Sequence, residues 1–278
     1  MLVAAAVCPC PPLLVPAVAA GARPELRGTR AACADALGVL AAARPDRLIV
    51  VGPAGESARG AYPGGATGSF AGFGVDVRVR LGESAVHESA VHESAVHESG
   101  AHESGAHEGD VQETDDSGAP DAPVAPGTAP PRALPASLAV AAWLLEQALW
   151  TAAPVTGLGV GEPLTTERCV QAGKEIAGEP GRTALLVMGD ASACRTLKAP
   201  GYLDERAAPF DEEVARALGS ADVAALKALD AELAYDLRAA GRAPWQILAG
   251  AAEGAGLDGA LLHDSAPYGV GYLVAVWS

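Results

Sequence analysis

A short polar cluster, Gly189-Asp190-Ala191-Ser192-Ala193-Cys194-Arg195, follows the apolar run from Thr183 to Met188. The run is typical of a buried strand, and the Gly-Asp pair indicates a tight turn at its end. Polar side chains at the carboxyl end of such a strand are where open α/β sheets hold ligands. The cluster therefore supplies candidate site residues: Asp190 for catalysis, and Gly189, Ser192, Arg195 and Lys198 for ligand binding. A plain turn in which Ser192 caps the following segment remains the alternative.

Arg195 and Lys198 would favour an anionic ligand, although a solvated loop explains them as well.

Three thiols add a second kind of chemistry. Cys8 and Cys10 follow the first apolar run, and Cys194 lies in the polar cluster. Thiolates bind Zn, Cu(I) or Fe–S iron, so Cys8, Cys10 and Cys194 are candidate metal ligands, with Asp190 or His263 beside them. A reactive thiol is a second possibility, and a buried Cys that acts as a small apolar residue is a third.

Strands and helices that would position these residues alternate along the chain. Apolar or alternating patterns predict strands at 2–7, 47–51, 73–79, 155–160, 183–188 and 271–277. Caps and periodic patterns predict helices at 24–43, 134–150 and 165–177, from Pro209, after Ser220 and Asp230, and from Pro244. This order predicts an α/β layered fold with a mostly parallel or mixed central sheet flanked by helices. Three loops would meet at the strand ends: 8–12, with Cys10; 52–56, with Gly52; and 189–195.

Residues 82–134 have a different composition from the rest of the chain. Five copies of a five-residue unit, such as Ala-Val-His-Glu-Ser, fill residues 85–109, and an acidic, Pro- and Gly-rich tract follows. A period of five matches neither a strand nor a helix. We expect a disordered insertion within a single domain of residues 1–278. The repeats are interpreted either as an expansion without function or as a loose site for divalent metal.

Charge and hydropathy narrow the classes of function. The formal net charge is −15, but residues 83–121 hold eleven acids and no Lys or Arg. The rest of the chain is only mildly acidic, and without a basic surface we expect no nucleic-acid partner. Apolar runs are too short for a membrane span, and no basic region precedes the N-terminal run, so we expect neither membrane nor signal peptide. The odd number of Cys favours a reducing cytoplasm.

Four motifs, taken in order, resemble the LigB-like family of class III extradiol ring-cleavage dioxygenases and their Memo-like relatives. They are Val7-Cys8-Pro9-Cys10-Pro11-Pro12, Gly189-Asp190-Ala191-Ser192-Ala193, Ala208-Pro209-Phe210-Asp211 and Tyr268-Gly269-Val270-Gly271-Tyr272. The chain is also similar to an actinobacterial branch of that family. The resemblance implies the layered α/β fold and a crevice in which two His and one Glu hold Fe(II) for opening catechol rings.

This chain departs from that pattern at the iron ligands. Cys10 stands where the first His is expected, the loop after the second strand has Gly52-Pro53-Ala54, and Ala193 replaces a His of the Gly-Asp motif. Outside the repeats, His263 is the only His, and Glu253 is a candidate for the Glu ligand. His263 could act as a base beside Asp264, or be an ordinary loop residue. The resemblance therefore indicates a homologue of the extradiol dioxygenases that has lost or altered its iron chemistry and binds a small molecule or protein partner. The alternative is a metalloenzyme with a rebuilt Cys/Asp site.

Overall fold

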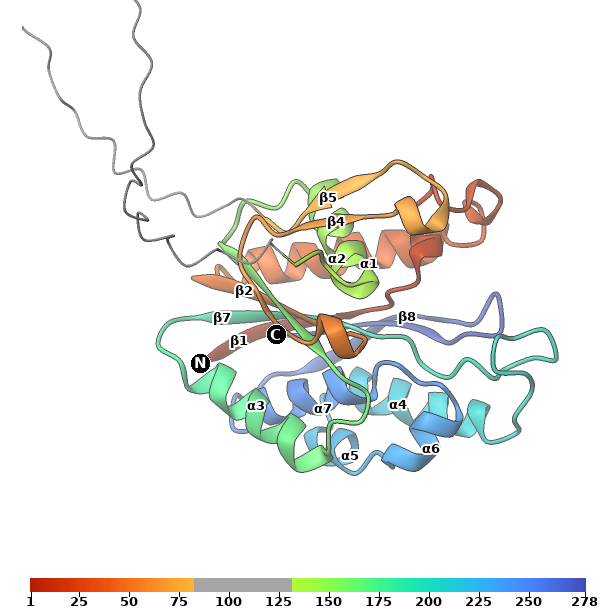
Figure 1. Cartoon of the computed structure of the whole chain (residues 1–278). Coiled ribbons are helices and arrows are strands. Elements are labelled where there is room, and N and C mark those ends of the chain that lie inside the picture. Colours follow the sequence, from red (N-terminus) through yellow and green to blue (C-terminus); the bar gives the residue numbers. More distant parts are fainter. Residues whose placement is uncertain (83–131) are drawn as a thin grey trace, which may run out of the picture. The chain divides into compact units, whose positions relative to one another are not determined.

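A seven-stranded mixed sheet forms the middle layer of the computed structural model, which describes residues 1–82 and 132–278 (Figure 1). The strand order is β3-β6-β2-β7-β1-β9-β8. The bounds are Leu2–Cys8 for β1, Arg47–Pro53 for β2, Gly60–Tyr62 for β3, Val155–Val160 for β6, Thr183–Met188 for β7, Gly259–Ser265 for β8 and Tyr272–Trp277 for β9. The central strands β6, β2, β7 and β1 run parallel, and antiparallel strands flank them. The predicted α/β layered fold is confirmed.

Helices cover both faces of this sheet (Figure 1). One face carries α1 (Arg27–Ala42), α2 (Ala136–Gln147) and the two-stranded sheet of β4 (Thr67–Ser69) and β5 (Arg78–Arg80). The other face carries α3 (Thr166–Gly178), α4 (Ala207–Gly219), α5 (Val223–Lys227), α6 (Ala231–Asp236) and α7 (Arg242–Ala251). Short 3-10 turns lie at Pro12–Leu14, Ala20–Ala22, Glu56–Ala58 and Ala71–Phe73. The sheet therefore separates two apolar cores.

Strand β7 shows why the central strands are continuous apolar runs rather than alternating ones. All six of its residues are buried. Leu186 and Met188 pack into the core under α1 and α2, whereas Leu185 and Val187 pack into the core under α3 and α7. A parallel strand covered on both faces has no solvent side, so Ala184 to Met188 are all apolar, and the one polar residue, Thr183, is buried at the start of the strand. Strand β7 therefore contributes side chains to both cores. It lies between β2 and β1 in the sheet, so the loop after β7 lies beside the loops after those two strands.

Several predicted boundaries were wrong. The strand expected at 73–79 is a 3-10 turn at Ala71–Phe73 followed by the three-residue β5. Strand β8 was not predicted; it is an edge strand whose Leu261 and Leu262 are each 40% exposed, so it lacks a buried pattern. Asp222, rather than Ser220, caps α5 through a bond to the N–H of Ala225.

Helix α4 also begins earlier than its sequence indicated. It starts at Ala207 instead of Pro209, which moves Asp211 out of the first turn and buries it. Much of the predicted insertion 82–134 lies outside the described residues. Within the described residues, no helix is both long and apolar enough to cross a membrane.

Candidate functional site

The carboxyl ends of the four parallel strands lie along one edge of the sheet. A cavity of about 840 Å³ opens there, beside the loops after β2 and β6. Its lining comes from these two loops and from the segment around the end of α6: Pro53, Ala54, Gly55, Arg59, Glu162, Pro163, Tyr235, Asp236, Arg238 and Ala240. We call this the strand-end pocket. Its volume lies in the range that small-molecule sites occupy, roughly 300–1,000 Å³.

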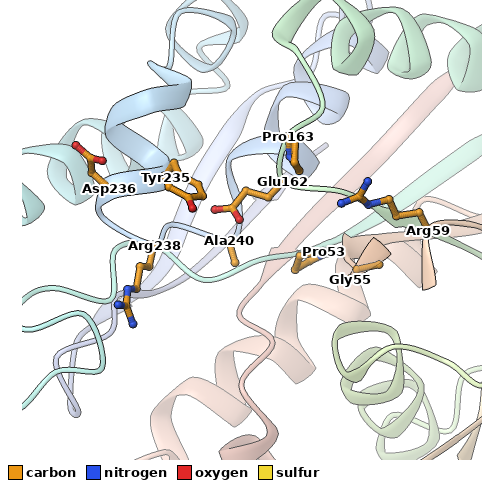
Figure 2. A pocket seen from close by; sticks show the side chains of 10 residues that line it. Pro53, Gly55, Arg59, Glu162, Pro163, Tyr235, Asp236, Arg238 and Ala240 are labelled. Carbon is orange, nitrogen blue, oxygen red and sulfur yellow. The ribbon is translucent and has the colours of Figure 1, made fainter. Parts of the chain in front are cut away.

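Charged side chains of both signs line the strand-end pocket (Figure 2). Arg59 and Arg238 lie on opposite sides, and the Glu162 carboxylate points toward the Tyr235 hydroxyl between them (Figure 2). Asp236 instead pairs with Arg206, with an N···O distance of 3.2 Å. The pocket therefore offers two guanidinium groups, one carboxylate and one phenol to a ligand.

Close packing and hydrogen bonds fix the two arginines. A Cβ on Gly161 would collide with Nε of Arg59, so the glycine at this position makes room for the guanidinium. Arg238 donates from Nη1 to the carbonyl of Pro200 at 3.0 Å. Its backbone has φ of 55°, in the left-handed region. Arg238 is thus anchored by a side-chain hydrogen bond, whereas Arg59 packs against the backbone at Gly161.

The loop that carries Glu162 is held from behind by the buried Arg242, 4% exposed. Its guanidinium donates to the carbonyl of Leu164 at 2.6 Å, to Oε1 of Gln246 at 3.1 Å and to the carbonyl of Glu162. A planar guanidinium can serve three acceptors at once because its donors form a fixed fork. Arg242 is therefore a positioning residue for this wall of the pocket.

The Gly189–Asp190 turn lies behind the strand-end pocket rather than in its lining. The backbone N–H of Gly241, next to the lining residue Ala240, donates to the carbonyl of Asp190 at 2.9 Å. A Cβ on Gly189 would collide with Cα of Gly241. Gly189 is required by this backbone contact. Gly189, which was predicted as a ligand contact, thus lets two loops pack against each other in this structure.

Asp190 itself lies against the loop after β1. Its Oδ1 accepts a hydrogen bond from the backbone N–H of Cys10 at 2.8 Å. Burial raises the pKa of Asp190 to about 7, and the bond from Cys10 partly opposes this rise. Burial likewise raises the pKa of the Tyr272 hydroxyl, and the nearby Asp190 carboxylate adds to the effect. A carboxyl that titrates near neutrality, with a buried phenol nearby, suits acid/base chemistry, so the catalytic role of Asp190 stays a prediction.

Asp211 is a buried carboxylate whose role the sequence did not indicate. It accepts bonds from the backbone N–H and the hydroxyl of Ser192, each at 2.8 Å, and from Nη1 of Arg195 at 3.0 Å. Burial raises the pKa of Asp211, and the donors of Ser192 and Arg195 oppose the rise. The hydroxyl of Ser192 is therefore engaged inside the protein. Its role in this structure is to hold the loop after β7.

Of the three predicted thiol ligands, Cys194 lies apart from the other two. Cys8 and Cys10 belong to the core under α1 and α2, whereas Cys194 belongs to the opposite core and donates from Sγ to the carbonyl of Leu237 at 3.5 Å. Hydrogen bonding to Cys33 and burial raise the pKa of Cys8; burial also raises the pKa of Cys10 and of Cys194. Within residues 1–82 and 132–278, no three His, Cys, Asp or Glu side chains form a metal-binding group. These residues therefore do not fit the Fe(II) site that the family resemblance implies.

His263 and Glu253 lie in other contacts. His263 is part of β8, not of a loop, and its Nε2 lies 3.0 Å from Oγ1 of Thr29 and 2.8 Å from Oγ of Ser265. Glu253 follows α7 and forms ion pairs with Lys174, at 2.7 Å, and with Lys227. The imidazole thus links β8 to α1, and the carboxylate links helices on the other face.

Gly52, Arg195 and Lys198 complete the predicted set. A Cβ on Gly52 would lie 2.8 Å from Oγ of Ser137, so Gly52 permits close packing of β2 against α2. Arg195 and Lys198 both line a cavity separate from the strand-end pocket, and their role in ligand binding stays a prediction.

The pocket residues Arg59, Glu162 and Arg238 were missed because no local pattern marks them. They come from three loops that are far apart in the sequence, and each is an ordinary charged surface residue in its own sequence context. No protein-family model matches this chain, and no curated protein matches it. The resemblance to the LigB-like family therefore stays a prediction from the sequence motifs.

Proposed function

We propose that this chain binds a small anionic molecule in the strand-end pocket, as a LigB-like homologue that has lost the iron chemistry of extradiol dioxygenases. The observation that carries the binding proposal is the placement of Arg59 and Arg238 on opposite sides of a pocket of small-molecule size. Two guanidinium groups suit a phosphate or dicarboxylate, because each can donate two parallel hydrogen bonds to an oxyanion. Glu162 and Tyr235 would add selectivity for a hydroxyl or amino group on the same molecule.

The loss of iron chemistry is supported by the side chains at the strand ends. Cys10, whose backbone N–H is bonded to Asp190, and Gly52, which is packed against Ser137, offer no imidazole. His263 is engaged with Thr29 and Ser265. The rebuilt Cys/Asp metalloenzyme receives no support, since Cys194 lies in a different core from Cys8 and Cys10. All five cysteines are free and buried, which supports a reducing compartment such as the cytoplasm.

Isothermal titration of the full chain with inorganic phosphate and with malonate tests the binding proposal. We expect measurable binding of at least one anion, weakened about tenfold or more in Arg59→Gln and in Arg238→Gln, because each variant removes charged hydrogen bonds. Arg168→Gln, on the exposed side of α3, is the matched control and should bind like the parent chain. Equal affinities in all four proteins, or no binding of either anion, would contradict the proposal.

Catechol oxidation tests the loss of iron chemistry separately. The chain is incubated with Fe(II), oxygen and catechol, and formation of the yellow ring-opened product is followed by absorbance. We expect no product above a control without protein. Steady product formation that depends on the protein would refute this part of the proposal and leave the anion-binding part untouched.

A further inference from the structure

A second cavity, of about 670 Å³, lies between the loop after β7 and the loop joining β8 to β9. We call it the loop pocket. Its lining includes Arg195, Leu197, Lys198, Leu203, Tyr268 and Gly269, none of which lines the strand-end pocket. The two cavities are therefore separate candidate sites.

Backbone contacts fix the two walls of the loop pocket against each other. The N–H of Arg195 donates to the carbonyl of Gly269 at 3.0 Å, and the N–H of Gly271 donates to the carbonyl of Ser192 at 2.8 Å. Gly269 has φ of 75°, and a Cβ there would lie 2.6 Å from Cβ of Ala199. A side chain at position 269 would thus push the loops apart. The pocket is a formed feature of the fold.

The charged groups that line the loop pocket are both cations, although the chain carries a net charge of −15. Arg195 is held by its ion pair with Asp211, in which Nη1 lies 3.0 Å from Oδ2. Asp211 is 2% exposed and is also bonded to Ser192, whereas the Arg195 side chain is 28% exposed and lines the cavity. Lys198 adds a second, exposed ammonium group. An oxyanion is the ligand that such a pair would attract.

Large apolar side chains surround these cations and are unusually exposed. Leu197 is 62% exposed, Leu203 45% and Tyr268 36%. Apolar groups gathered around a cavity indicate a binding surface more often than single exposed residues do. Tyr268 offers a ring face for stacking, while Leu197 and Leu203 offer aliphatic contact. The preferred ligand should therefore carry an aromatic body as well as a negative charge.

We propose that the loop pocket binds an aromatic carboxylate, whose carboxylate pairs with Arg195 and Lys198 and whose ring packs on Tyr268, Leu197 and Leu203. This site is independent of the proposed strand-end pocket. Its ligand needs an apolar ring, which the strand-end pocket, lined by four charged side chains, does not favour.

Titration of the full chain with 1-naphthoate tests this proposal, with acetate and 1-naphthalenemethanol as matched probes. Acetate supplies the charge without the ring, and the alcohol supplies the ring without the charge. We expect 1-naphthoate to bind at least about fivefold more tightly than either probe. Equal binding of the naphthoate and the alcohol, or no binding of the naphthoate, would overturn the proposal.

Variants locate the ligand. Lys198→Gln and Tyr268→Ala should each weaken naphthoate binding about fivefold, because one loses a charged contact and the other a ring contact. No Arg195 variant is used, because the loss of this side chain would disturb the buried Asp211 and the fold. Lys174→Gln, which removes the same charge from α3, should bind like the parent chain. Arg59→Gln should also leave naphthoate affinity unchanged. Loss of affinity in Arg59→Gln, with Lys198→Gln unaffected, would place the ligand in the other pocket and overturn the assignment.

Discussion

The carboxylate of Asp190 accepts a 2.8 Å hydrogen bond from the backbone N–H of Cys10, and this bond joins the loops after β7 and β1. These two strands are neighbours in the sheet, so the bond continues their pairing beyond its end. It also keeps an acidic group in a buried position, where the charged form is disfavoured. The protonation of this carboxyl therefore changes close to neutral pH.

The contribution of Asp190 to stability should decrease as the pH rises from about 4 to about 7. The pKa of Asp190 is raised to about 7 in the folded chain, above its ordinary value near 4, so the folded state binds the proton more tightly across this window. Asp190→Asn keeps an acceptor for Cys10 but cannot ionise. Between pH 5 and pH 8 its free energy of unfolding in urea should fall by at least about 1 kcal/mol less than that of the parent chain. Parallel pH profiles for the two proteins would show that this carboxyl does not titrate as described.

Removal of the buried acceptor at position 211 should be strongly destabilising. Asp211→Ala leaves the buried N–H and hydroxyl of Ser192 without a partner, which costs about 1–3 kcal/mol for each unsatisfied group, and it also removes the ion-pair partner of Arg195. Glu213→Gln breaks the exposed pair with Arg216 and should cost less than about 1 kcal/mol. Urea unfolding of both variants measures the difference. Similar losses in the two variants would mean that the Asp211 network contributes little.

Gly189→Ala should destabilise the protein by more than about 2 kcal/mol, because its Cβ would collide with Cα of Gly241 and backbone cannot move aside cheaply. Gly38→Ala is the control. A Cβ at that position in α1 meets nothing within 4 Å, so the change should stabilise by up to about 1 kcal/mol through helix propensity. Thermal unfolding of the two variants should therefore shift the melting temperature in opposite directions. A neutral Gly189→Ala would indicate that the two loops are not in contact.

Arg242→Lys should weaken anion binding in the strand-end pocket although Arg242 does not line it. An ammonium group cannot reach the carbonyls of Glu162 and Leu164 and the amide of Gln246 in the planar arrangement of a guanidinium. The loop that carries Glu162 should then lose its fixed position. Titration with phosphate or malonate should show weaker affinity, while the naphthoate affinity of the loop pocket stays unchanged. Equal loss at both pockets would point to general unfolding instead.

The sequence predicted the central strands well because burial on both faces leaves continuous apolar runs, as in β7. It failed at the margins, where β8 exposes Leu261 and Leu262 and places the polar His263 and Asp264 within a strand. The candidate site residues were harder to predict from the sequence than the strands. Asp190 was predicted as a candidate because it follows a buried strand, and its catalytic role stays a prediction. The role of Asp211 was not predicted, because its contact with Ser192 joins two segments that only the fold brings together.

The residues of the strand-end pocket could not be predicted without the fold. Arg59, Glu162 and Arg238 share no motif, and only the parallel order of β2 and β6 brings the first two together. Arg195 and Lys198 were predicted as candidate anion-binding residues because they follow the Gly-Asp turn, and they line one cavity. Pro267 and Tyr268, which line the same cavity, could not be predicted, because only the pairing of β8 with β9 places the loop between them beside Arg195 and Lys198.

The chain leaves and re-enters the described fold at almost the same point. The N–H of Leu81 donates to the carbonyl of Ala66, and the N–H of Leu134 donates to the carbonyl of Thr67, each at 2.9 Å. Arg132 adds bonds to the carbonyls of Arg59 and Ala61. Both anchors therefore lie on two adjacent residues, Ala66 and Thr67, so the segment around β4 and β5 holds the chain at the point where it leaves the described fold and at the point where it returns.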